Sequence, residues 1–169
     1  MGFSYAGFCQ DAAARTFKFG GGIEVAAPAN NMAAYAIGVG ADLLGHYGLS
    51  DQIALTVDAG YMGFFVKKSY GDGTLSIIPI RGGIRYYPIQ HVYVSGRAGV
   101  GIMTGGTSTT SVAFAFGGGY MVDNKLDLGL AYEGYGGPKD QVIGTYPYTV
   151  VKKGASFGYV GLRLGYFFK

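Results

Sequence analysis

Ten charged side chains, all inside stretches of alternating sequence, are the residues best placed to carry chemistry. They are five bases and five acids: Lys18, Glu24, Asp42, Asp58, Arg81, Arg85, Arg97, Asp127, Glu133 and Arg163. Carboxylates that share one face, such as those of Asp127 and Glu133, could act as a general acid and a general base. Five bases share that face, however, and a charge in a narrow interior needs a partner of opposite sign. We therefore predict an ion-pair network whose formal charges sum to zero.

Histidine, cysteine and glycine motifs give little support to catalysis. His46 and His91 are predicted to lie in short turns, where most histidines are solvated. Cys9 is the only cysteine, so neither a disulfide nor a Cys/His metal site is expected. The triple glycines at 20–22 and 117–119 lack the following helix and lysine of a phosphate-binding loop. The sequence therefore predicts no enzymatic activity, no metal and no cofactor.

The stretches that carry these charges alternate with a period of two from residue 17 onward, which is typical of β-strands. There are eight alternating stretches, seven of which carry these charges, and each has about 9–12 residues, the length of a tilted strand that crosses a bilayer. Loops follow the first, third, fifth and seventh stretches, whereas short turns follow the second, fourth and sixth. An even number of strands with loops at one end and turns at the other is typical of outer-membrane barrels.

Composition indicates which face of these strands meets the membrane. Charged residues make up only 14% of the 169 residues and apolar residues 49%, against about 25% charged in an ordinary soluble domain. All ten charges lie opposite the bulky apolar face. A soluble barrel with that charged face outward would have too few charges for its surface, so we expect the apolar face to contact lipid. The remaining inward positions are expected to be Gly, Ala, Ser and Thr.

Two other classes of protein are excluded by the same numbers. The net charge is +3, and no run of Lys or Arg exceeds two residues, so nucleic acid is not an expected partner. No stretch of about 20 residues is dominated by large apolar side chains, so no transmembrane helix is expected.

Four stretches carry a family resemblance: residues 78–87 (IPIRGGIRYY), 92–101 (VYVSGRAGVG), 126–133 (LDLGLAYE) and 160–168 (VGLRLGYFF). Over about residues 15–169, the chain resembles the small bacterial outer-membrane β-barrel family, akin to the outer-membrane protein A transmembrane domain and the outer-membrane protein X type. The resemblance implies an all-β fold, an eight-stranded antiparallel up-and-down transmembrane β-barrel in the bacterial outer membrane.

The same resemblance implies partners. Outer-membrane lipids and lipopolysaccharide would surround the barrel. Tyr166 and Phe168 in the closing strand resemble an assembly signal that the outer-membrane assembly machinery reads. Some small barrels modify lipid A, and the deacylases among them resemble one another in a His and a Ser on an outward face near the loop end. Neither His46 nor His91 fits that pattern, so this enzyme is the third of the functions considered.

Two segments lie outside the predicted strands, one at the N-terminus and one in the last long loop. Residues 1–14 are expected to be a disordered leader or signal remnant, and residues 15–169 the barrel domain. A loop from about residue 134 to 155 mixes aromatic and basic side chains, and its candidate binding residues are Tyr135, Lys139, Tyr146, Tyr148, Lys152 and Lys153. Such a loop could contact host surfaces, glycans or lipopolysaccharide phosphates. The sequence thus predicts a non-enzymatic structural or surface-interaction protein, with a narrow passive pore as the alternative.

Overall fold

The computed structural model describes residues 16–30, 32–70, 73–104, 109–123, 125–136, 141–143, 150–152 and 156–168. The expected leader, residues 1–14, lies outside the described residues. Within the described ranges, no helix combines the length and the apolar character needed to cross a membrane.

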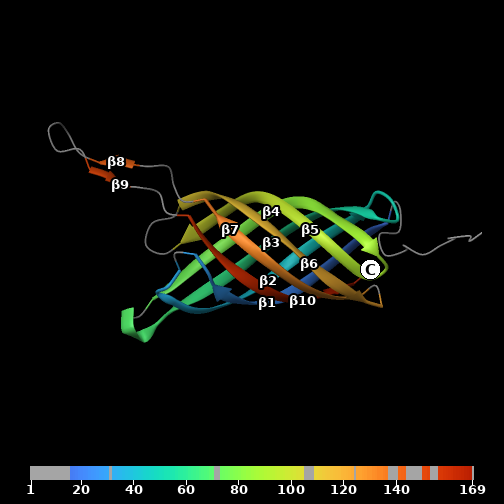
Figure 1. The fold of residues 1–169 in the computed structure, drawn as a ribbon, viewed down its shortest axis with the longest axis horizontal. Coiled ribbons are helices and arrows are strands. Elements are labelled where there is room, and N and C mark those ends of the chain that lie inside the picture. Colours follow the sequence, from blue (N-terminus) through green and yellow to red (C-terminus); the bar gives the residue numbers. More distant parts are fainter. Residues whose placement is uncertain are drawn as a thin grey trace, which may run out of the picture.

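Eight antiparallel strands close into a barrel, as predicted (Figure 1). They are β1 (Phe17–Pro28), β2 (Tyr35–Gly48), β3 (Ile53–Val66), β4 (Thr74–Ile89), β5 (Val92–Thr104), β6 (Thr109–Val122), β7 (Leu126–Tyr135) and β10 (Phe157–Phe167). Each strand pairs with the next around the barrel, and β1 pairs with β10 to close it, from Gly20 opposite Phe167 to Pro28 opposite Tyr159. Closure leaves no strand edge unpaired, which a sheet in lipid requires.

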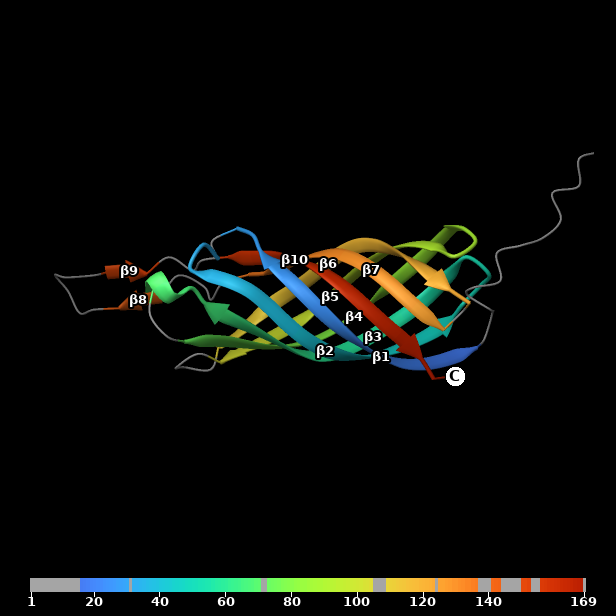
Figure 2. The same cartoon turned by 90° about the horizontal axis from the view of Figure 1, so that it is seen from below.

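Within the part of the chain that the structure describes, three short elements lie outside this sheet. A 3₁₀ turn, η1 (Lys68–Tyr70), follows β3, and β8 (Gln141–Ile143) pairs with β9 (Val150–Lys152) as a separate hairpin. Figures 1 and 2 show β8 and β9 beyond one end of the barrel, whereas the C-terminus lies at the other end. We call these the loop end and the short-turn end.

Two of the three short turns contain a non-glycine residue in the left-handed region. His91, between β4 and β5, has φ 67°, and Asp123, between β6 and β7, has φ 50°. Histidine and aspartate adopt this conformation more readily than most residues. The connections at the short-turn end therefore consist of only a few residues each.

Several strands are longer than the sequence pattern predicts. β4 has 16 residues and begins at Thr74, before its first predicted apolar position at Ile78. β6 begins at Thr109, inside a predicted loop, and β7 extends to Tyr135. Pairing continues at these ends, as in the contact of Phe65 with Thr74, although the small and polar residues there show no clear alternation.

The outer face of the barrel is apolar. Ile23, Val112 and Leu162 are each more than 60% exposed, and no outward position of the eight barrel strands carries a charge. Aromatic rings stand outward near both ends, Tyr86, Tyr120 and Tyr166 at one and Phe65 and Phe114 at the other. An apolar band between aromatic girdles is the surface that a bilayer requires.

The interior has three layers, which corrects the prediction of small inward residues. An apolar cluster fills the loop end: Ala26, Met32, Met62, Phe64, Ile77, Met103, Ala113, Tyr135 and Tyr159. A second fills the short-turn end: Leu44, Ala54, Tyr87, Tyr93, Met121 and Phe167. The charged residues lie between the two clusters. Small residues are present because large ones need them: a Cβ on Gly101 would lie 2.6 Å from the Tyr135 ring.

Candidate functional site

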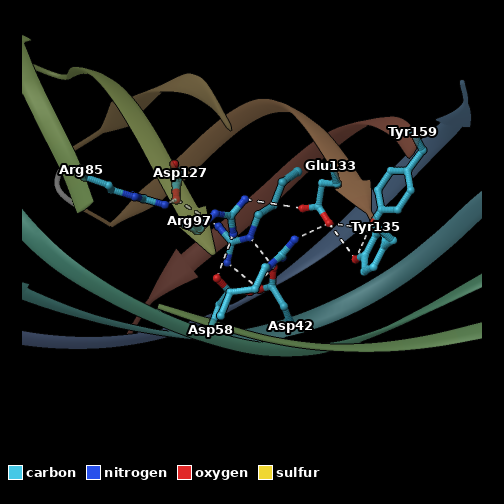
Figure 3. A network of polar contacts seen from close by, with 10 residues as sticks. Asp42, Asp58, Arg85, Arg97, Asp127, Glu133, Tyr135 and Tyr159 are labelled. Atoms are coloured by element: carbon cyan, nitrogen blue, oxygen red, sulfur yellow. Dashed lines mark hydrogen bonds and ion pairs between the residues drawn. The ribbon is translucent and has the colours of Figure 1, made fainter. Parts of the chain in front are cut away.

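Two arginines and two acids form the centre of the charged layer. Arg81 donates to Asp58 through Nε at 2.9 Å and Nη2 at 2.8 Å, and through Nη1 to Glu133. Arg97 reaches the other oxygens of the same acids, Asp58 Oδ1 at 3.2 Å and Glu133 Oε1 at 3.5 Å. Both acids are 1% exposed. Figure 3 shows the acids of the network projecting from facing walls of the barrel toward the arginines.

A second chain of ion pairs leads toward the short-turn end. Arg163 binds Asp42 through two bonds of 2.6 Å, from Nε and Nη2, and its Nη1 lies 3.0 Å from Asp127 Oδ2. Arg85 Nη2 lies 2.7 Å from the same oxygen of Asp127. The Tyr93 hydroxyl donates to Asp127 Oδ1 at 2.6 Å, and the Arg85 guanidinium lies over the Tyr93 ring at 4.1 Å. Asp127 is therefore bound by two guanidiniums and one phenol.

Tyr135 has a different role from the one predicted. It was expected to be an exposed binding residue of a loop, but it is the last residue of β7 and is fully buried. Its ring stacks on Phe157 at 5.2 Å, and its hydroxyl donates to Glu133 Oε2 at 3.2 Å, as the Tyr159 hydroxyl does at 2.6 Å. Tyr135 is two residues from Glu133, so the period of two could have placed it inward.

His46 also differs from its prediction. It lies within β2 rather than in a turn and is 1% exposed, with its ring 5.8 Å from Phe167 and 6.2 Å from Tyr87. His91 does occupy a short turn, with its ring 5.8 Å from Tyr120. Neither histidine is near the outward loop-end face, and the described residues contain no cluster of His, Cys, Asp and Glu that could hold a metal.

The other predicted residues divide into three groups. Glu24 and Lys18 share the inward face of β1; Glu24 is buried and Lys18 half-buried. Tyr166 and Phe168 stand outward at the C-terminal end, edge to face at 5.8 Å. Of the loop residues, Lys152 lies in β9, and those outside the described residues are Lys139, Tyr146, Tyr148 and Lys153.

The charged layer leaves little free space. Two small cavities adjoin Glu24, one of about 20 Å³ beside Arg97 and Arg163 and one of about 10 Å³ beside Gly60 and Pro79. A cavity of this size holds about one water molecule. The arrangement can hold the walls of the barrel together, but these cavities have no room for an organic substrate.

Comparison with known proteins identifies the architecture. No family model matches the chain, and no curated protein matches its sequence. The solved structure of Ail, the attachment invasion locus protein of Yersinia pestis, matches with a TM-score of 0.60 and 15% identity, over 92% of this chain and 99% of that one. Neisserial surface protein A matches with a TM-score of 0.51 and 16% identity, over 89% and 96%.

A third match is the N-terminal β-barrel domain of Pseudomonas aeruginosa OprF. Its TM-score is 0.51 at 15% identity, over 90% of this chain and all of that one. The chain therefore has the fold of the small eight-stranded outer-membrane barrels. With its apolar exterior and charged interior, the barrel is built for the bacterial outer membrane.

Proposed function

We propose that this chain is a non-enzymatic outer-membrane protein whose closed barrel is a scaffold for loops that bind anionic glycans. The observation that carries the proposal is the filled interior. Apolar clusters occupy both ends of the lumen and ion pairs occupy the middle. A ligand larger than water then has to bind at the exposed surface, and loops on a rigid scaffold commonly carry binding.

Charge at the loop end favours an anionic partner. The loop-end connections contain five lysines and two aspartates, a net charge of +3: Lys67, Lys68, Lys139, Lys152 and Lys153 against Asp72 and Asp140. Lys67 and Lys68 are exposed. A surface of one sign attracts ligands of the other. One solved structure of Ail is a complex with the heparin analogue sucrose octasulfate, so a barrel of this fold has been solved with a sulfated sugar.

We expect heparin to bind the refolded chain and to bind a triple variant, Lys139→Gln with Lys152→Gln and Lys153→Gln, about tenfold more weakly. An ion pair made by one surface lysine is typically worth about 0.5 kcal/mol, so the loss of three gives about a tenfold change in Kd. Calorimetric titration of detergent-solubilised protein measures it. Lys125→Gln, a charge removal at the short-turn end, is the matched control and should bind as wild type does. Equal affinity of the triple variant and wild type would contradict the proposal.

The alternative function, a narrow passive pore, requires a lumen that conducts ions, whereas the scaffold proposed here requires a closed one. With both ends packed, the inserted barrel is expected to be silent in a planar lipid bilayer under an applied voltage. The faster gel mobility of unboiled protein serves as the control for folding. Discrete conductance steps from folded protein would favour the pore and would require the apolar clusters at both ends to open.

The end of the closing strand has the aromatic residues expected of an assembly signal. Tyr166 and Phe168 present aromatic rings outward at the end of the closing strand, where they are accessible to another protein before the barrel is surrounded by lipid. We infer that the outer-membrane assembly machinery recognises this aromatic end.

A further inference from the structure

The charged layer has one more acid than it has guanidiniums. Its members are Glu24, Asp42, Asp58, Asp127 and Glu133 against Arg81, Arg85, Arg97 and Arg163. Eight of these nine residues form the ion pairs described above. Glu24 is 8% exposed and makes no hydrogen bond or ion pair with the described residues. Lys18 lies six residues away on the same strand, about 20 Å.

Burial of a lone carboxylate is unfavourable. An ionised group taken out of water loses several kcal/mol of hydration unless an opposite charge replaces it. The charged and phenolic residues that line the two cavities beside Glu24 are Asp42 of β2, Tyr61 of β3, Arg81 and Arg85 of β4, Tyr93 and Arg97 of β5, Glu133 of β7, and Tyr159 and Arg163 of β10. The arginines among them are engaged with other acids, so the positive charge that Glu24 needs has to come from outside the chain.

A break in the barrel wall lies beside this carboxylate. The β3–β4 ladder runs without interruption to the pair of Ala59 with Ile80 and resumes at Met62 with Ile77. Between these pairs, Gly60 faces Pro79. The Tyr87 amide donates to the Gln52 carbonyl of the same ladder at 2.8 Å, so alternate residues of β4, counted from Tyr87, point their amides at β3.

Pro79 is one of those alternate residues and has no N–H to donate. The Gly60 carbonyl is therefore without its ladder donor. The cavity of about 10 Å³ is lined by Glu24, Gly60 and Pro79 among others. Glu24, whose carboxylate has no donor among the described residues, and Gly60, whose carbonyl lacks its ladder donor, thus line the same small cavity.

We propose that this cavity binds one small monovalent cation, held by the carboxylate of Glu24 and the carbonyl oxygen of Gly60. Hard cations prefer oxygen ligands, and the cavity admits a single particle of about the size of water. A water molecule would fill the space but would leave the fifth carboxylate without a counter-charge. The cation is either an alkali ion such as Na⁺ or a proton bound to the carboxylate of Glu24 itself, since both supply the same charge.

Urea unfolding of the full chain, refolded in detergent, tests the site and separates the two sources. NaCl is replaced stepwise by N-methyl-D-glucamine chloride at constant ionic strength, because that organic cation is too large for the cavity. If Na⁺ binds, the unfolding constant falls about tenfold for each tenfold rise in Na⁺ above the Kd. If a proton binds, Na⁺ has no effect and the unfolding constant rises by up to about tenfold per pH unit, because unfolding releases that proton.

Glu24→Gln keeps the shape of the side chain and removes the charge, so it should lose whichever response wild type shows. Glu24→Met, of similar length, serves if the glutamine variant does not refold. Asp51→Asn removes an exposed carboxylate from a short turn and should respond as wild type does. A wild-type barrel that responds to neither Na⁺ nor pH would overturn the proposal, and so would a response that both Glu24 variants retain.

Discussion

Replacing Arg81 with leucine is expected to lower the free energy of unfolding of the barrel by about 3–5 kcal/mol, the range for breaking a buried ion pair by removing one partner. Arg81 is 3% exposed and donates to both Asp58 and Glu133. Without it, Arg97 is the one guanidinium among the described residues that still contacts these two buried acids. Urea unfolding in detergent measures the change by circular dichroism, because the chain has no Trp for fluorescence.

Arg97→Leu is the matched comparison, since it removes a guanidinium from the same two acids. We expect a smaller loss, about 1–2 kcal/mol, because Arg97 lies farther from the acids, at 3.2 and 3.5 Å, and each acid keeps Arg81. Neutralising the acids in the Arg81→Leu background, with Asp58→Asn and Glu133→Gln, should restore part of the stability. Equal losses from the two arginine variants, or no recovery on neutralisation, would mean that packing rather than charge determines the effect.

The direction in which each charged side chain points was predictable because the bilayer and the strand impose the same rule. Strand residues alternate between faces, and lipid excludes charge from one of those faces. Every charged residue of the eight barrel strands accordingly points inward, including Lys18 at one end of β1 and Arg163 in β10. The two-residue period of the strands and the exclusion of charge by lipid were sufficient to predict which way these side chains point.

The choice of ion-pair partners was not predictable in the same way. Arg163 pairs with Asp42, which lies 121 positions away in the sequence and two strands away around the barrel. That pairing depends on the stagger between strands, which closure of the barrel sets globally. Arg85 and Arg163 converge on Asp127 for the same reason. A count of charges predicted a balanced layer, but only the structure shows Glu24 without a partner.

The positions at which the strands end were also not predictable from the sequence pattern. The inward positions of His46 and Tyr135 follow from their parity with Asp42 and Glu133, yet both were assigned to connections. Near the ends of β2 and β7 the outward residues are glycines as well as large side chains, for example Gly45 and Gly134. Alternation between apolar and small residues therefore loses its contrast there, although the pairing of the strands continues.

Gly101→Val is expected to lower the free energy of unfolding by about 1–3 kcal/mol, the cost of overpacking a filled interior. A Cβ at this inward position of β5 would lie 2.6 and 2.7 Å from two carbons of the Tyr135 ring. That ring has little freedom to move, because it stacks on Phe157 and its hydroxyl bonds Glu133. The added side chain would disturb the packed loop-end layer and the ion pairs next to it.

Gly96 provides the control on the same strand. It faces outward, and no atom lies within 4 Å of a Cβ built there, so Gly96→Val should leave the unfolding free energy unchanged or raise it by about 0.5–1 kcal/mol as a glycine leaves a strand interior. A Gly101→Val loss that Tyr135→Ala relieves would locate the clash at that ring. If both glycine variants lose stability equally, the cost belongs to the β5 backbone, and the close fit of large side chains over glycines does not hold the lumen closed.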